Sequence, residues 1–121
     1  MNILIYDDNT AFAMQLEEDI SEYFHNPNMN INVVTDHFDQ IEGTYDVIFM
    51  DIELNDKNGI EIAKYHKNKH DCLVIFTSSH ENLVFNTFQV EPFQFIRKNH
   101  YDYDKNIVFK QLKEKLLTLY I

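Results

Sequence analysis

Val47-Ile48-Phe49-Met50-Asp51 is a run of four apolar residues followed by a carboxylate, and no other stretch of the chain is as informative. A short apolar run without polar alternation is typical of a strand that is buried on both faces of a parallel sheet. The run Ile3-Leu4-Ile5-Tyr6 has the same character and also ends in acids, Asp7 and Asp8. The two runs therefore predict two buried strands that carry carboxylates at their carboxyl ends.

Two further apolar runs also end in polar residues. The run Leu73-Val74-Ile75-Phe76 is followed by Thr77, and the run from Phe93 to Ile96 is followed by Arg97 and Lys98. The carboxyl ends of parallel strands lie along one edge of a sheet, which is where open α/β sheets bind their ligands. We therefore expect three carboxylates, a hydroxyl and an ammonium to converge at this edge.

Segments with the apolar spacing of helices alternate with these runs. We expect helices at 10–24, around 37–41, at 60–69, more weakly at 81–88, and at 104–120. We expect strands at 2–6, 31–34, 46–50, 73–77 and 93–97, with a loop at 54–58. The inward residues of the last helix are predicted to be Ile107, Val108, Leu112, Leu116 and Leu119. This alternation predicts one α/β domain, a doubly wound parallel sheet whose right-handed crossovers leave few strand orders.

Composition and charge exclude several classes of protein. A chain of 121 residues with 45% hydrophobic content can form one packed domain without disulfides, and its single cysteine, Cys72, is expected in the core. The net charge of −10 disfavours direct binding to nucleic acid or to an anionic membrane, because both are polyanions. No signal-peptide pattern and no apolar stretch of the roughly 20 residues that span a bilayer is present, so we expect a cytoplasmic protein.

The converging polar residues predict a metal and phosphoryl site. Like charges that lie close together are unfavourable unless a cation neutralises them, and carboxylate oxygens are ligands that Mg²⁺ prefers. A carboxylate beside such an ion can attack phosphorus and form an aspartyl phosphate, whose oxygens Thr77 and Lys98 could bind. Taken singly, each residue has a simpler explanation: Asp7 and Asp8 can cap a helix, Thr77 can end a strand, and Lys98 can be solvated.

These residues resemble the receiver domain of bacterial two-component response regulators, the CheY-like family. The resemblance covers essentially the whole chain, in the order expected. It implies a flavodoxin-like (βα)5 fold with strand order 2-1-3-4-5 and a phosphoacceptor signalling domain over residues 1–121. Such a domain is not an enzyme, although it catalyses its own phosphotransfer and dephosphorylation. The matching residues are Ile3 to Asp8, Val47 to Ile52 with Gly59 eight positions after Asp51, Ile75 to Ser78, and Phe95 to Lys98.

The resemblance also implies which residues bind the metal and accept the phosphate. Asp51 would accept phosphate from a sensor histidine kinase and would contact Mg²⁺. Asp8 would bind the ion directly, Asp7 mainly through water, and Glu53 through its backbone carbonyl.

Thr77 and Lys98 would bind the phosphoryl oxygens. The family usually has proline after this lysine, joined by a cis bond, whereas this chain has Asn99. A cis bond before a non-proline residue costs ~2.5–4 kcal/mol, so we expect a trans bond here. Phe95 stands at the position of the aromatic switch. Its ring has no hydroxyl, so it is either a switch that depends on burial alone or a fixed core residue.

A narrower resemblance, carried by Asp51 to Leu54 and by Thr77 to Lys98, especially Phe88 to Phe93, is to receivers of the LytTR type, which include AgrA-like quorum-sensing regulators. In that class a DNA-binding domain follows the receiver, and this chain contains no such segment. Both an excised domain and a stand-alone protein fit the sequence, and DNA binding would need a C-terminal domain absent here. Phosphorylation would repack the face of the fourth helix, fifth strand and last helix, favouring a partner or a homodimer.

Three other functions fit parts of the pattern. A phosphatase of the haloacid-dehalogenase type would use Asp51 as a nucleophile, but it usually has a second Asp where this chain has Glu53. A flavin-binding module needs a loop rich in Ser, Thr and Gly after the first strand, and Asp7-Asp8 would repel its phosphate. A receiver-like domain that only mediates contacts would not need the intact set of Asp, Thr and Lys residues, although Asn99 in place of proline fits this alternative.

The histidine pair on the third expected helix gives a weaker signal. His66 and His70 stand four residues apart, which is the spacing of a helical metal pair, but no third ligand is evident. His70 near the end of a helix is better explained by its interaction with the helix dipole.

Overall fold

The computed structural model of the chain describes residues 1–38, 41–54 and 57–119. Its centre is a parallel sheet of five strands in the order β2-β1-β3-β6-β7. Along the chain, this is the predicted order 2-1-3-4-5. The strands are β1 (Asn2–Tyr6), β2 (Asn30–Val34), β3 (Val47–Asp51), β6 (Leu73–Ser78) and β7 (Gln94–Arg97).

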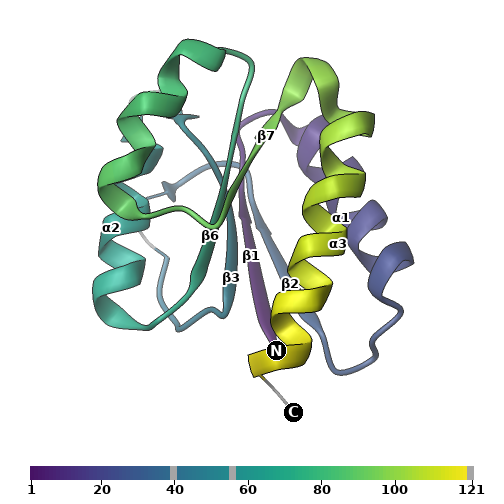
Figure 1. The fold of residues 1–121 in the computed structure, drawn as a ribbon. Coiled ribbons are helices and arrows are strands. Elements are labelled where there is room, and N and C mark those ends of the chain that lie inside the picture. Colours follow the sequence, from purple (N-terminus) through teal and green to yellow (C-terminus); the bar gives the residue numbers. More distant parts are fainter. Residues whose placement is uncertain (39–40, 55–56, 120–121) are drawn as a thin grey trace.

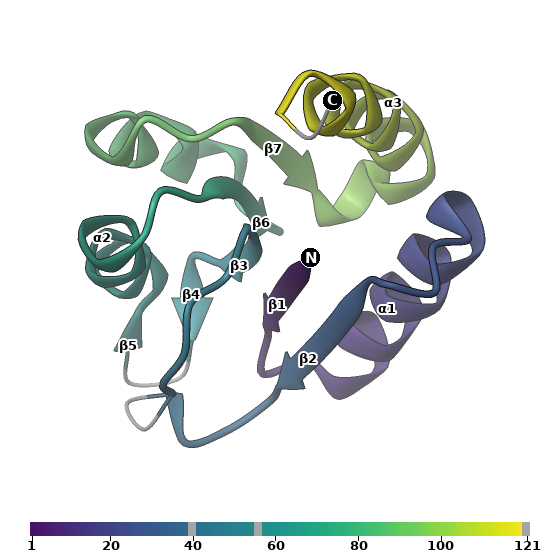
Figure 2. The same cartoon turned by 90° about the horizontal axis from the view of Figure 1, so that it is seen from below.

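Helices cover both faces of the sheet, as Figures 1 and 2 show. On one face lie α1 (Thr10–Phe24) and α3 (Tyr101–Leu119). On the other lie α2 (Gly59–Lys69) and the 3-10 helix η2 (Glu81–Val90). The predicted doubly wound fold is therefore confirmed. Within the described ranges, none of the helices combines the length and the apolar character that crossing a membrane requires.

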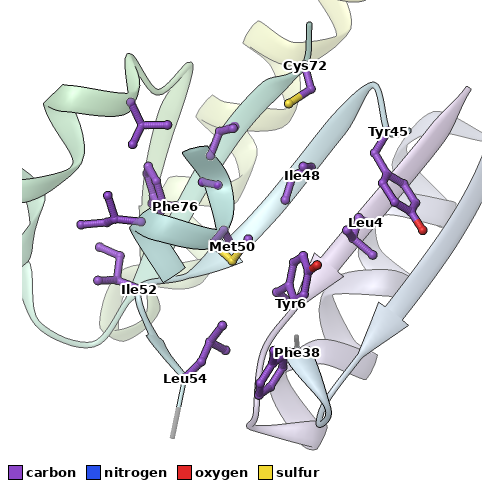
Figure 3. Packing of buried hydrophobic residues seen from close by; sticks show 14 residues of the cluster. Leu4, Tyr6, Phe38, Tyr45, Ile48, Met50, Ile52, Leu54, Cys72 and Phe76 are labelled. Carbon is purple, nitrogen blue, oxygen red and sulfur yellow. The ribbon is translucent and has the colours of Figure 1, made fainter. Parts of the chain in front are cut away.

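Each face of the sheet contributes to its own core, because successive side chains of a strand point to opposite faces. The core under α2 and η2 contains Leu4, Ile48 and Phe76 (Figure 3), and the core under α1 and α3 contains Ile5 and Phe49. Cys72 lies in the first core, as predicted, and burial raises the pKa of its thiol to about 11. This thiol is therefore a packing group at neutral pH.

The first helix begins and ends where its local sequence requires. The side-chain oxygen of Asn9 accepts a hydrogen bond from the Phe12 amide at 3.1 Å and so caps the amino end. His25 adopts a left-handed conformation with φ of 47° at the carboxyl end, just before Pro27. The buried residues of α1 recur at helical spacing and are Ala13, Leu16 and Ile20.

The segment after β3 is more regular than the predicted loop at 54–58. Two short strands, β4 (Glu53–Leu54) and β5 (Lys57–Asn58), pair antiparallel, so the loop prediction is wrong for these residues. Leu54 is fully buried, which draws this segment against the core. The side chain of Asn58 then accepts the Ile60 amide at 2.8 Å and begins α2.

The helix predicted weakly at 81–88 is a 3-10 helix that continues to Val90. The Thr87 hydroxyl donates to the carbonyl of Val84, three residues earlier, at 2.6 Å. Both residues are β-branched, and such residues lose side-chain freedom in an α-helix. Glu91, with φ of 54°, ends the segment before Pro92. The predicted helix is therefore confirmed, in the 3-10 form and with two more residues at its carboxyl end.

The last helix begins earlier than predicted. A 3-10 turn, η3 (Lys98–His100), leads directly into α3 at Tyr101 rather than at Asp104. The acids of the first turn, Asp102 and Asp104, complement the positive end of the helix dipole. The helix buries Val108, Phe109, Leu112 and Leu116.

Three predictions are not confirmed: one is wrong, and two concern residues that lie partly or wholly outside the described part of the chain. Ile107 is 41% exposed, so its predicted inward position is wrong. Its neighbour Val108 is buried, as predicted, and because successive helical residues point about 100° apart, the two cannot both face the sheet. The side chain of Leu119 and residues 120–121 lie outside the described part. The helix expected around 37–41 includes residues 39–40, which also lie outside it, while Phe38 is buried in the core.

Candidate functional site

The carboxyl ends of the central strands bring the predicted site residues together at one edge of the sheet, the upper edge in Figure 1. Asp7 follows β1, Asp51 is the last residue of β3, and Lys98 follows β7. Thr77 on β6 is the register partner of Asp51. Asp7 and Thr77 are each 1% exposed and Asp51 is 4% exposed, so the edge contains buried polar groups.

Three carboxylates form the centre of this site. Asp7, Asp8 and Asp51 each offer an oxygen, and these three oxygens all lie within 4.8 Å of one another. The Asp7 Oδ1 atom accepts the backbone N–H of Asn9 at 2.8 Å. Its other oxygen, Oδ2, is buried and accepts no well-directed hydrogen bond from any described residue. The ammonium of Lys98 lies 2.8 Å from this oxygen, so the oxygen is charge-paired but its hydrogen-bonding capacity is not satisfied, which leaves it able to bind a cation.

Lys98 reaches the carboxylates from the end of β7. Its Nζ atom lies 2.8 Å from Asp7 Oδ2 and donates to Asp51 Oδ2 at 3.2 Å. The side chain is only 14% exposed, so water screens this ion pair weakly. The Lys98–Asn99 peptide bond is trans, as predicted, since none of the described bonds is cis. The ammonium therefore reaches the site without the backbone geometry that is usual in the family that the sequence resembles.

Asp51 has a strongly perturbed carboxyl group. Burial is the main cause and the nearby charge of Asp7 the second, and together they raise its pKa to about 7. Lys98 opposes this shift, and so does the N–H of Glu53, which donates to Asp51 Oδ1 at 3.2 Å. An additional positive charge at the site would favour the ionised form.

Gly59 allows α2 to start close to the end of β3. A Cβ atom at this position would overlap the backbone carbonyl oxygen of Asp51. The Gly59 N–H donates to the carbonyl of Ile52 at 2.9 Å. A side chain at this position would therefore displace the strand end that carries the Asp51 carboxylate.

The donor set fits a hard divalent cation. Mg²⁺ prefers carboxylate and carbonyl oxygens and usually keeps several waters. The three clustered carboxylates outnumber the one ammonium, Lys98, that contacts them, and the pKa of Asp51 stays raised in spite of it, so the site can take up a further positive charge. The side chain of Glu53 pairs with His80, with 2.5 Å between Oε1 and Nδ1, and the role of its backbone carbonyl as a metal ligand stays a prediction.

Arg97 is turned away from the carboxylates, although sequence alone places it beside Lys98. Its Nε and Nη2 atoms each donate to the carboxylate of Asp104 at 2.9 Å, and Nη1 donates to Glu81 at 3.4 Å. The hydrogen bonds from Arg97 lower the pKa of Asp104. Arg97 thus joins the end of β7 to α3 and η2, one residue before Lys98. Sequence reasoning missed this pairing, because it depends on where α3 begins.

Phe95 lies on β7, two residues before Arg97, and is half-buried. Its ring packs against the core under α2 and also lines a groove of about 450 Å³ between η2, β7 and α3. The groove is lined by Glu81, Val84, Gln94, Phe95, Arg97, Tyr103, Asp104, Ile107 and Val108. Both predicted roles of Phe95, switch and core residue, remain predictions.

Phe12, on α1, is a site residue that sequence reasoning did not place at the site. The Lys98 Nζ atom lies 4.7 Å from the centroid of its ring. A signal was available, because Phe12 stands in the first helical turn, four residues after Asp8, and this turn must face the sheet edge.

His66 and His70 are each engaged elsewhere. The Nε2 atom of buried His66 lies 2.8 Å from the hydroxyl of Tyr6, and burial lowers the pKa of the imidazole. His70 is the carboxyl cap of α2 and lies 3.5 Å from Asp46. Within the described residues, the metal-type cluster comprises Asp7, Asp8 and Asp51 and includes neither histidine.

Comparison with protein families gives one match, which covers most of the chain. Residues 3–108 match the model of the response regulator receiver domain. The sensory transduction protein LytR of Staphylococcus epidermidis is 30% identical, with 81% of this chain and 40% of that protein covered. The transcriptional regulatory protein LytR of Staphylococcus aureus is 38% identical, with 45% and 22% covered. The chain thus spans less than half the length of these curated relatives.

Solved structures show the same fold. The BeF3-activated DrrB receiver domain superposes with a TM-score of 0.76 at 19% identity, with 95% of this chain and 96% of that one covered. The response regulator TrrA from Thermotoga maritima, in complex with Mg²⁺ and BeF, gives a TM-score of 0.71 at 19% identity, with 93% and 96% covered. At this identity the likeness supports the flavodoxin-like fold alone.

Proposed function

The chain belongs to the family of response regulator receiver domains, and on this basis we propose that Asp51 accepts a phosphoryl group from a sensor histidine kinase. The observation that carries the proposal is the placement of the Asp51 carboxylate, buried at the end of β3 between Asp7 and the ammonium of Lys98. The proposed receiver comprises residues 1–121, within the two-component system to which such domains belong.

In the proposed reaction an oxygen of the Asp51 carboxylate attacks the phosphorus of a phosphohistidine. A P–O bond forms, the P–N bond breaks, and the imidazole leaves with the electron pair of that bond. The Lys98 ammonium is already at the site and can bind a phosphoryl oxygen, and Thr77 stands opposite Asp51 on the neighbouring strand. Such charge-assisted hydrogen bonds are among the stronger ones in proteins.

We propose Mg²⁺ as the cofactor of this step. Asp7, Asp8, Asp51 and the backbone carbonyl of Glu53 would hold the ion, in agreement with the clustered oxygens and the buried Asp7 Oδ2. When bound, it would neutralise charge on the phosphoryl oxygens. The protein residues position the nucleophile and exclude bulk water from it, since Asp51 is almost fully buried.

Phosphorylation would act on the face formed by η2, β7 and α3. A phosphoryl group adds about −1.5 to −2 charge at pH 7, and Lys98 and Thr77 are the groups that would move toward it. Lys98 directly follows Arg97, which joins β7 to both neighbouring elements through Asp104 and Glu81. A shift of Lys98 would therefore reach the groove that Phe95 lines, and a partner or a second copy of the chain would bind the changed face.

The names of the relatives support a transcriptional output. The chain is similar to proteins named transcriptional regulatory protein LytR, and it covers only the smaller part of their length. We propose that the domain regulates a DNA-binding output of the LytTR type in the cytoplasm. DNA contact would come from a separate domain, because the net charge of −10 opposes direct binding by this one.

Intact-mass measurement after incubation with Mg²⁺ and acetyl phosphate tests the proposed function. We expect wild-type protein to gain the mass of one phosphoryl group and Asp51→Asn to gain none. Asp36→Asn is the matched control, because it removes the same charge from an exposed position. An equal mass gain in Asp51→Asn, or no gain in the wild type and the control, would contradict the proposal.

A further inference from the structure

The Lys98 ammonium lies between two kinds of partner. On one side are the carboxylate oxygens of Asp7 and Asp51, at 2.8 and 3.2 Å. On the other is the ring of Phe12, whose centroid is 4.7 Å from Nζ. The face of an aromatic ring attracts a cation, and the attraction is largest where water is excluded. At 14% exposure, the Lys98 side chain meets this condition.

The ring of Phe12 is itself held in place by α3. It makes an edge contact with Tyr101, at 5.2 Å between centroids and 70° between planes. The Tyr101 hydroxyl donates to Asp19 Oδ2 on α1 at 2.6 Å, and Lys105 donates to the same oxygen at 3.2 Å. Burial and the bond to Asp19 raise the pKa of Tyr101, so the hydroxyl keeps its proton. These contacts tie the first turns of α3 to Asp19 of α1, and Tyr101 also packs against the Phe12 ring.

A further contact fixes the turn that contains Lys98. The side-chain amide of Asn99 donates to the carbonyl of Ser79 at 3.3 Å, which joins the η3 turn to the loop after β6. The turn is therefore attached to the loop after β6 by Asn99 and to α1 through Tyr101, while its peptide bonds are trans. From this turn the Lys98 side chain extends to the carboxylates of Asp7 and Asp51, and its ammonium also contacts the ring of Phe12.

We propose that Phe12 is a positioning residue for Lys98: its ring, held by Tyr101, keeps the ammonium at the carboxylates although the Lys98–Asn99 bond is trans. An aromatic contact between α1 and η3 would thereby do in this chain what a cis peptide bond after the lysine does in the family that the sequence resembles. The expected effect of Phe12 on the rate of phosphotransfer rests on the proposed function of Asp51. The expected effect of Phe12 on the position of the Lys98 ammonium does not.

The first experiment measures the ammonium directly and needs no phosphorylation. In ¹⁵N NMR an ordered, buried lysine ammonium gives a resonance with slow proton exchange, and Lys98→Met identifies which one belongs to Lys98. We expect Phe12→Leu to speed this exchange and Phe12→Tyr, which keeps the ring, to preserve it. Met14→Leu on the same helix is the control, since Met14 is 53% exposed. Unchanged exchange in Phe12→Leu, with circular dichroism showing a folded protein, would overturn the inference.

The second experiment measures phosphorylation by acetyl phosphate at saturating Mg²⁺. We expect Phe12→Leu to lower the rate roughly three- to thirtyfold, with Mg²⁺ affinity unchanged and the rate restored in Phe12→Tyr. In a Lys98→Met background, Phe12→Leu should have no further effect, because its action passes through the lysine. A further loss in that background would overturn the inference. If Phe12→Leu does not fold, Phe12→Met provides the same comparison.

The two experiments separate failure of the inference from failure of the proposed function. If wild-type protein takes up no phosphate while its Lys98 ammonium depends on the ring, the proposed function fails and the positioning role stands. If wild-type protein is phosphorylated and the ammonium is indifferent to Phe12, the positioning role fails and the proposed function stands.

Discussion

Replacement of Asp51 by asparagine should stabilise the protein in a way that depends on pH. In the folded protein, burial and the charge of Asp7 raise the Asp51 pKa from 3.8 to about 7. Between these values the folded state holds this proton more tightly than the unfolded chain, so the free energy of unfolding falls as pH rises. Asparagine does not ionise, so the free energy of unfolding of the variant should not fall with pH through this group.

The size of the effect follows from the shift. Each pH unit between the two pKa values costs about 1.4 kcal/mol, so ionising Asp51 costs roughly 4 kcal/mol above pH 7. Asp51 is 4% exposed, which leaves little solvent screening to reduce this figure. The variant also loses the hydrogen bond from Lys98, but the ammonium keeps Asp7 at 2.8 Å. We therefore expect a net gain of about 2–4 kcal/mol at pH 8.

Urea unfolding followed by circular dichroism, with a chelator present, measures the difference between variant and wild type. The sequence pI is about 4.8, where solubility is lowest, so the series should start near pH 5.5. From there to pH 8 the stability difference should grow by about 2 kcal/mol. Asp36→Asn, at an exposed position, controls for the change in net charge. A difference that is constant across the series, or that shrinks as pH rises, would refute the reasoning.

Three further predictions concern the surroundings of the site. Gly59→Ala should destabilise the protein by about 1–3 kcal/mol in urea unfolding, because its Cβ would overlap the Asp51 carbonyl, and wild-type stability would contradict this. Tyr6→Phe should cost about 1–3 kcal/mol by the same assay, since buried His66 loses the hydroxyl at 2.8 Å; a neutral effect would show that the contact is dispensable. Mg²⁺ at about a hundred times its Kd should raise the free energy of unfolding by about 2.7 kcal/mol. The rise should be visible as a higher Tm in thermal unfolding, and Asp8→Asn should abolish it.

The strand-ending polar residues were predictable because parallel strands have few ways to arrange their ends. Once the runs before Asp7, Asp51 and Thr77 are accepted as buried parallel strands, their carboxyl ends must share an edge. The order of the strands could not be derived from the residues alone, because right-handed crossovers still leave a few possible strand orders. The family resemblance supplied the order that the structure shows. The trans bond at Lys98 followed from the absence of proline.

Features that depend on contacts between distant residues were not predictable. The early start of α3 accompanies the pairing of Arg97 with Asp104, and neither residue indicates the other in the sequence. The helix at η2 was predicted but its 3-10 form was not, since propensity is a weak guide where local side-chain hydrogen bonds compete. The position of Phe12 in the first turn of α1 indicates that it lies near the sheet edge, but its contact with the Lys98 ammonium depends on how α1 packs against that edge.

Locating the phosphoryl group after reaction tests the central claim most directly. The wild-type protein, incubated with Mg²⁺ and acetyl phosphate, is digested and its peptides are sequenced by mass spectrometry. The proposed function predicts one modified residue, Asp51, and no modification when a chelator replaces Mg²⁺. A phosphoryl group on any other residue, or modification of Asp51 that proceeds equally well in the chelator, would contradict it.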